Sequence, residues 1–215
     1  MSITFYYGSG SPYAWRVWLA LEHKQLPYEL KMLSFSAGDT SKPEFLKLNP
    51  RHKVPVLVDN GLALYESSAI VEYLEDQYPK SGNGALFPQQ AGERAVARRL
   101  ILEADNYLRV ALDPMLRQIF FKPETEWDAQ QIAASREEFL AELKHFENEV
   151  RGDYLVNKLS AADFALYPVL ALALRLEKKK PDLALRPELG PKLTAWMKRI
   201  EALPYFVKTL PPHWK

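Results

Sequence analysis

Three short segments of the sequence carry the side chains best suited to chemistry. They are SPYAWRV at residues 11–17, NPRHKVPVL at residues 49–57 and LYESSAI at residues 64–70. Ser11, which precedes a proline, is typical of the residue that starts a helix, and Ser67 or Ser68 is expected to start another. Backbone amides at the start of a helix bind anions. The segments are therefore candidates for binding a polar ligand with charged ends.

The composition narrows the chemistry that these segments can perform. The chain has no cysteine, which excludes disulfide bonds, thiolate metal ligands and catalysis by a protein thiol. Its four histidines, at positions 23, 52, 145 and 213, lack the spacing of a metal site, so no metal is expected. Any catalysis or ligand binding must therefore use hydroxyls, carboxylates, backbone amides or a bound cofactor.

The charge balance and the hydropathy pattern limit the partners. Lys and Arg number 28 and Asp and Glu number 27, giving a net charge of +1. This balance argues against a nucleic-acid partner. No run approaches the roughly 18 apolar residues of a membrane span, and residues 1–12 do not resemble a signal peptide. We therefore expect a cytoplasmic protein without a membrane partner.

The first eighty residues mix strand and helix signals. β-Branched and aromatic residues predict the strands, Asn60-Gly61 predicts a hairpin turn between two of them, and prolines end the helices. The resulting order βαβαββα is the layout of a thioredoxin-like domain, with the first two strands parallel and the last two antiparallel. The predicted strands are residues 3–7, 28–33, 54–58 and 62–64, and the helices are 12–26, 43–48 and 67–78.

The rest of the chain is predicted to be almost entirely helical. Residues 81–87 form a linker, and long helices are expected over 93–121, 127–150, 160–180 and 192–203, with Pro114 kinking or breaking the first. Ser160 and Asp163 form a capping box at the start of the third. The fold class is thus α/β plus all-α: a thioredoxin-like domain over residues 1–80, then a helical bundle domain over residues 88–215.

The motifs together resemble one enzyme family. NPxxKVPxL, the LxESxAI run that follows it, and YLVNKLSAADFALYP resemble the signatures of cytosolic glutathione transferases. The pattern SPxxxRVxxAL is similar to their serine-type classes, such as the tau, zeta and theta-like enzymes. The matches cover residues 5–168 in the family's order. Asn157 stands where a glycine is common in the family, and asparagine tolerates the same turn.

The resemblance implies a glutathione site with glutathione as co-substrate. Glu66 would accept from the γ-glutamyl ammonium, and Ser67 with the amides of its helix would bind the neighbouring carboxylate. Pro55 is cis in the family, and Val54 before it would pair with the cysteinyl backbone. Arg16 is expected to serve the structure or an ion pair. The glycine carboxylate would be met by Lys53 and His52.

Ser11 is the candidate for activating the thiol. The thiolate is the nucleophile, and a hydroxyl that donates to sulfur stabilises it. Lowering the thiol pKa by about two corresponds to roughly 2.7 kcal/mol, which suits one charge-assisted hydrogen bond aided by the helix dipole. Ser11 fits equally well as a helix cap. Ser9, Tyr6 and Tyr7 remain alternatives for the same role.

The implied function is conjugation of glutathione to small hydrophobic electrophiles, a detoxification activity, by a homodimer. Two alternatives remain open: a glutathione-dependent isomerase of the zeta type, and a non-catalytic protein that binds glutathione or another ligand. The acceptor pocket is expected between the domains. Aromatic side chains are its candidate lining, namely Tyr13, Tyr107, Phe120, Phe121, Tyr167 and Trp214.

Overall fold

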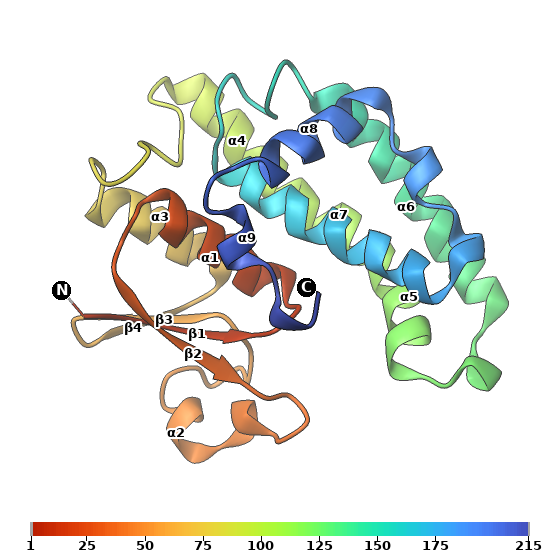
Figure 1. Ribbon diagram of the computed structural model, residues 1–215, viewed down its shortest axis with the longest axis horizontal. Helices are drawn as coiled ribbons and strands as arrows, with labels where there is room; N and C mark the ends of the chain where they lie inside the picture. The colour runs from red at the N-terminus through yellow and green to blue at the C-terminus, as the bar shows by residue number, and fades with distance from the viewer. Residues whose placement is uncertain (1, 215) are drawn as a thin grey trace. The chain divides into compact units, whose positions relative to one another are not determined.

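A mixed sheet forms the centre of the first part of the molecule (Figure 1). The computed structural model describes residues 2–214. Strand β1 is parallel to β2, and β3 is antiparallel to both β1 and β4. Helices α1 and α3 cover one face of the sheet and α2 lies against the other (Figure 1), which confirms the thioredoxin-like order βαβαββα. The strands, in spatial order, are β2 (Tyr28–Leu33), β1 (Ile3–Gly8), β3 (Val56–Asp59) and β4 (Leu62–Tyr65), and the helices are α1 (Pro12–His23), α2 (Pro43–Leu46) and α3 (Ser67–Gln77).

The hairpin between β3 and β4 turns at the predicted residues. Asn60 and Gly61 have φ angles of 48° and 91°, and Asp59 pairs with Leu62 across the turn. Two consecutive positive φ angles define the two-residue turn that Asn-Gly favours. This turn fixes the register of the hairpin, and the register decides which residues meet at the far end of β4.

The contacts divide the chain into two compact units, and the division differs from the expected one at its end. One unit contains the residues up to Phe87 together with those from Leu203 onward, and the other is Pro88–Ala202. The last part of the chain joins the first unit because helix α9 (Phe206–Thr209) packs on α1. There the indole Nε1 of Trp15 donates to the Oγ1 of buried Thr209 over 2.9 Å.

The second unit is helical, as predicted, but Pro114 does not end a helix. Helix α5 continues through it, and Ser135 of α6 bridges the backbone amide and carbonyl of the adjoining residues. The Ser135 hydroxyl accepts from the Met115 amide at 3.2 Å and donates to the Ala111 carbonyl at 2.5 Å. The helices are α4 (Ala91–Glu103), a π-helical segment (Ala104–Leu108), α5 (Arg109–Phe121), α6 (Ala129–Glu149), α7 (Ala161–Lys179) and α8 (Pro191–Glu201).

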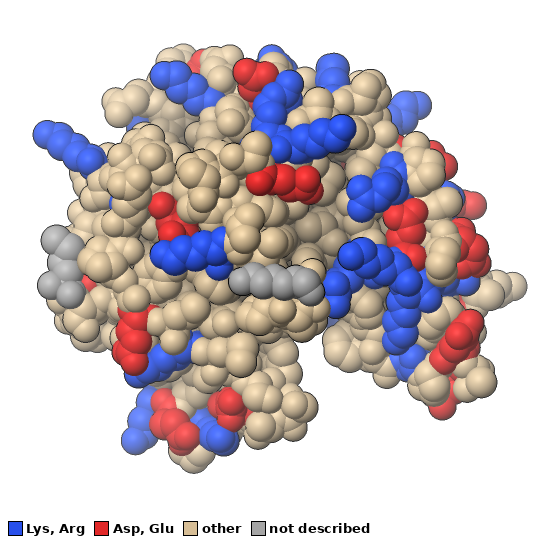
Figure 2. Space-filling view, viewed as in Figure 1, with Lys and Arg blue, Asp and Glu red and all other residues tan. Residues whose placement is uncertain are grey.

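The surface reflects the balance of charges. Positive and negative side chains are interspersed on the face shown in Figure 2. Within residues 2–214, no helix combines the length and the apolar character needed to cross a membrane.

A buried histidine in the first unit makes stability depend on pH. His23 is 5% exposed at the end of α1, and its Nδ1 lies 2.8 Å from the Tyr205 hydroxyl. The pKa of His23 is lowered from 6.5 to about 4, first by burial and then by the charge of Lys24, while the charge of Glu75 opposes the change. The imidazole is therefore neutral in the folded protein at neutral pH.

Acidification from pH 7.5 to pH 5 is expected to lower the free energy of unfolding through His23 by about 2 kcal/mol. The unfolded chain takes up the proton first, so the stability that is present above pH 6.5 is lost as pH falls towards 4. Denaturant unfolding at both pH values measures the loss, and His23→Gln should reduce it. Titration of His23 in the folded protein near pH 6.5, observed by NMR, would contradict the prediction.

Candidate active site

The sheet register brings the three predicted segments to one edge. Tyr6 of β1 pairs with Val56 of β3, and Val56 pairs with Tyr65 of β4. The end of β1, the start of β3 and the end of β4 therefore lie together. The loop of residues 8–11, residues 54–55 and the start of α3 continue from these three points.

Ser11 is the N-cap of α1. Its Oγ accepts from the Ala14 amide at 3.2 Å, and its own amide donates to the Gly8 carbonyl at 3.1 Å. A hydroxyl can accept and donate at once, so this cap leaves the Ser11 proton for a ligand. The capping role and a catalytic role are compatible in this geometry.

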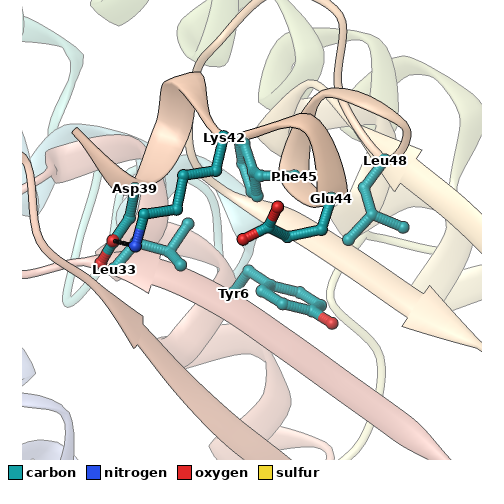
Figure 3. Close-up of a pocket in the computed structure, with 7 residues that line it drawn as sticks. All are labelled: Tyr6, Leu33, Asp39, Lys42, Glu44, Phe45 and Leu48. Carbon is teal, nitrogen blue, oxygen red and sulfur yellow. Dashed lines mark ion pairs between the residues drawn. The ribbon is translucent and has the colours of Figure 1, made fainter.

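The two tyrosines proposed as rivals leave the sheet on opposite faces. Tyr7 is 5% exposed, its ring centroid lies 4.9 Å from that of Trp18, and burial raises its pKa. Tyr6 points to the other face, where its ring lies 6.2 Å from that of Phe45. It borders a pocket of about 270 Å³ beside α2, in which Lys42 and Asp39 form an ion pair of 2.6 Å (Figure 3). The pocket is lined by Tyr6, Leu33, Asp39, Lys42, Glu44, Phe45 and Leu48.

Buried Asn49 holds the second segment in place. Its side-chain amide donates to the Lys53 carbonyl at 2.7 Å, and its Oδ1 accepts from the Arg51 amide at 2.9 Å. Asn49 was not among the predicted site residues, although its place at the head of the NPxxKVPxL motif was a signal. The Val54–Pro55 bond is cis, as the resemblance implied. Lys53 and His52 are exposed beside it.

Glu66 adopts an unusual backbone conformation at the start of α3. Its φ and ψ angles are 69° and 106°, and its side chain does not cap the helix. Such a conformation costs a residue with a side chain about 1–3 kcal/mol and is concentrated at functional sites. The carboxylate of Glu66 is exposed, and helix capping does not account for a glutamate in this strained position.

Arg16 links α1 to the start of α3. Its side chain is 2% exposed, and its Nη1 donates to the Ser67 hydroxyl at 3.2 Å and to the Ser68 hydroxyl at 2.8 Å. Both serine oxygens act as acceptors here, which leaves their protons for a ligand. The guanidinium also adds positive charge beneath the helix N-terminus, which favours an anion above it. The sequence signal was a basic residue between two apolar ones, Trp15 and Val17.

The candidates for the acceptor pocket are divided between the two units. In the first unit, the Tyr13 ring lies 5.5 Å from the Arg16 Cζ, and the Trp214 ring packs edge-on against Trp15 at 5.3 Å. In the second unit, Tyr107 and Phe121 are exposed and Phe120 is half-buried. Tyr167 is a core residue there: it is 4% exposed, and its hydroxyl donates to Glu201 at 3.0 Å.

Metal ligation was not expected, and the part of the chain that the structure describes contains no cluster of three or more His, Asp or Glu side chains able to hold a metal ion. The groups available for binding at this edge of the sheet are hydroxyls, one carboxylate, basic side chains and backbone amides. Such groups can bind both the positive and the negative charges of a zwitterionic peptide.

Comparison with known proteins identifies the chain as similar to glutathione S-transferases. A model described as the N-terminal domain of glutathione S-transferase matches residues 10–77, and one described as its C-terminal domain matches residues 104–204. The chain is 30% identical to Glutathione S-transferase A of Pleuronectes platessa over 217 residues, which covers 99% of this chain and 92% of that protein.

Solved structures agree on the fold. A glutathione S-transferase from the Antarctic clam Laternula elliptica has a TM-score of 0.81 and 29% identity, covering 100% of this chain and 94% of that one. A glutathione transferase from Burkholderia graminis, with two glutathione molecules bound per subunit, has a TM-score of 0.85 and 25% identity, covering 98% of this chain and 88% of that one. The chain belongs to the glutathione S-transferase family of enzymes.

Proposed function

We propose that this protein binds glutathione along the sheet edge and transfers its sulfur to small hydrophobic electrophiles. The observation that carries the proposal is the convergence of Ser11, Val54 and Glu66 on one edge of the sheet through the strand register. Glutathione is a short extended peptide with a thiol in its middle and charges at its ends, which matches the order of groups along this edge.

Each part of glutathione has a partner in the proposal. The γ-glutamyl ammonium binds the Glu66 carboxylate, and its carboxylate accepts from Ser67 and the first amides of α3. The backbone of Val54 pairs with the cysteinyl unit as an added strand would. The glycine carboxylate meets the basic side chains Lys53 and His52.

Ser11 supplies the activation step. Its hydroxyl donates to the sulfur and stabilises the thiolate, while the thiol proton leaves to solvent. The thiolate then attacks a carbon that bears a leaving group such as halide, forming a carbon–sulfur bond as the halide departs with the bonding electrons. The protein contributes positioning and charge stabilisation.

Three measurements test this function. Calorimetric titration with glutathione should show binding, and a chloronitrobenzene acceptor should be converted to its conjugate. Binding without turnover would favour the non-catalytic alternative. Turnover of an isomerisable substrate without consumption of glutathione, and no conjugation, would favour the isomerase alternative.

Glu66→Gly is expected to stabilise the fold by about 1 kcal/mol and to weaken glutathione binding by about tenfold or more. Glycine adopts the positive φ of position 66 without the penalty of a side chain, whereas loss of the carboxylate removes a charge-assisted hydrogen bond. Thermal unfolding and calorimetric titration measure the two effects. Glu66→Gln is the matched control, which should weaken binding without raising stability. Unchanged affinity in both variants would contradict the placement of the γ-glutamyl end.

A homodimer is proposed as well. Exposed apolar side chains support it, namely Leu62 on edge strand β4 and Leu102 and Val110 in the second unit. Light scattering should return twice the chain mass of 24.7 kDa. A monomer at micromolar concentration would exclude it.

A further inference from the structure

The segment of residues 203–214 lies against the loop that carries Ser11. Trp15 of α1 anchors it twice, by donating to Thr209 over 2.9 Å and by packing edge-on against Trp214 at 5.3 Å. Thr209 is fully buried, and its hydroxyl donates in turn to the Phe206 carbonyl at 2.9 Å. The anchor holds the residues that follow it in a defined position beside the loop.

His213 is bonded on both sides of its ring. Its Nδ1 lies 2.7 Å from the Ser9 Oγ, and its Nε2 accepts from the Trp214 indole at 2.9 Å. An indole N–H can only donate, so Nε2 carries the lone pair and, in the neutral ring, Nδ1 carries the proton. Nδ1 therefore donates to Ser9, and the Ser9 hydroxyl keeps its own proton for another acceptor.

The imidazole also rests on the backbone of the loop. Gly10 has a φ of +86°, and a Cβ at this position would lie 3.1 Å from the His213 Cε1. Glycine is thus suited to position 10 both by its conformation and by the closeness of the ring. His213 contacts the two residues that immediately precede Ser11.

We propose that His213 is a positioning residue for thiol activation, which holds Ser9 and Gly10 so that the Ser11 hydroxyl is presented to the sulfur. The inference rests on the proposed role of the loop in glutathione activation. A loop with a glycine next to the reacting hydroxyl has many accessible conformations, and a hydrogen bond from an anchored segment reduces them. His213 itself need not touch the substrate.

Two substitutions distinguish a positioning role of His213 from a role in packing alone. In His213→Asn the side-chain amide nitrogen stands at the position of Nδ1, so the donor to Ser9 is retained. In His213→Gln the amide nitrogen stands at the position of Nε2, and that donor is lost. The ultraviolet absorbance of the thiolate, followed against pH with glutathione bound, gives the apparent pKa of the bound thiol.

We expect His213→Gln to raise that pKa by about 0.5–1 and to lower kcat/KM for conjugation by about three- to tenfold. His213→Asn should keep both close to wild type. Ser9→Ala should reproduce the effect of His213→Gln, and the double variant should add little to either. Val207→Ala, at an exposed position of the same segment, is the control for disturbance of the segment.

The outcomes distinguish this inference from the proposed function. If Ser11→Ala raises the thiol pKa but His213→Gln and His213→Asn both match wild type, His213 has no positioning role and the function stands. If His213→Gln and His213→Asn lose stability equally without changing the thiol pKa, the contact is structural and the inference is overturned. If Ser11→Ala changes nothing while His213→Gln raises the pKa, the assignment of Ser11 fails, and the inference that His213 acts through Ser11 fails with it.

Discussion

Replacing Ser11 by glycine is expected to lower kcat/KM for glutathione conjugation by about 10- to 100-fold. The hydroxyl is the proposed donor to the sulfur, and a charge-assisted hydrogen bond contributes about 1.5–3 kcal/mol. Its loss should raise the pKa of the bound thiol by about 1–2. At neutral pH a smaller fraction of bound glutathione is then ionised, and the rate falls with it.

Glycine is chosen because Ser11 has a second task. Its Oγ caps α1 by accepting from the Ala14 amide, and an alanine there would cost about 1 kcal/mol of stability, whereas glycine at an N-cap costs only a few tenths. Ser11→Gly thus removes the hydroxyl with little loss of capping. Ser11→Thr retains both functions and serves as the matched control.

The pH profile of kcat/KM decides whether the serine acts on the thiol. In Ser11→Gly the activity should recover towards wild type as pH rises above the new thiol pKa. A uniform loss at every pH, with an unchanged absorbance titration, would show that Ser11 acts only by positioning. Unchanged kcat/KM would move the assignment to Ser9, the other hydroxyl of the loop.

The sequence predicted well those features that are determined by residues close together in the chain. Asn60-Gly61 predicted its turn because the two positive φ angles depend on those two residues. The cap at Ser160 and Asp163 formed for the same reason, since both partners lie within one helical turn. The family motifs placed Glu66 and Ser67 correctly at a helix start.

The features that sequence missed depend on residues far apart in the chain. Helix α5 is not broken at Pro114, and next to it Ser135 bonds the Met115 amide and the Ala111 carbonyl from another helix. The bond between Trp15 and Thr209 joins opposite ends of the sequence, so no local pattern could have assigned residues 203–214 to the first unit. The strain at Glu66 also had no signal, because a positive φ is ordinarily marked by glycine or asparagine.

Asp163 is the most connected buried carboxylate described in the second unit. It is fully buried and accepts from the Leu155 amide at 3.0 Å, the Ser160 amide at 2.8 Å and the Trp196 indole at 2.8 Å. One side chain thus joins the start of α7, the loop just before it and the distant helix α8. Burial raises the pKa of Asp163 to about 6, against the opposing effect of these hydrogen bonds.

Asp163→Ala is expected to lower the free energy of unfolding by about 3–5 kcal/mol, because it leaves several buried donors without an acceptor. Asp153→Ala is the control, since Asp153 is 71% exposed in an ion pair with Arg199 and should cost less than about 1 kcal/mol.

The loss caused by Asp163→Ala should also depend on pH in a defined direction. A raised folded-state pKa means that the carboxyl contributes most stability below its unfolded pKa of 3.8, and that this contribution falls as pH rises through about 6. The difference between wild type and Asp163→Ala should therefore be larger at pH 5 than at pH 8, by about 1 kcal/mol. Denaturant unfolding of both proteins at the two pH values measures it. A difference that is larger at pH 8 would show that the hydrogen bonds to the charged carboxylate outweigh the cost of burying it.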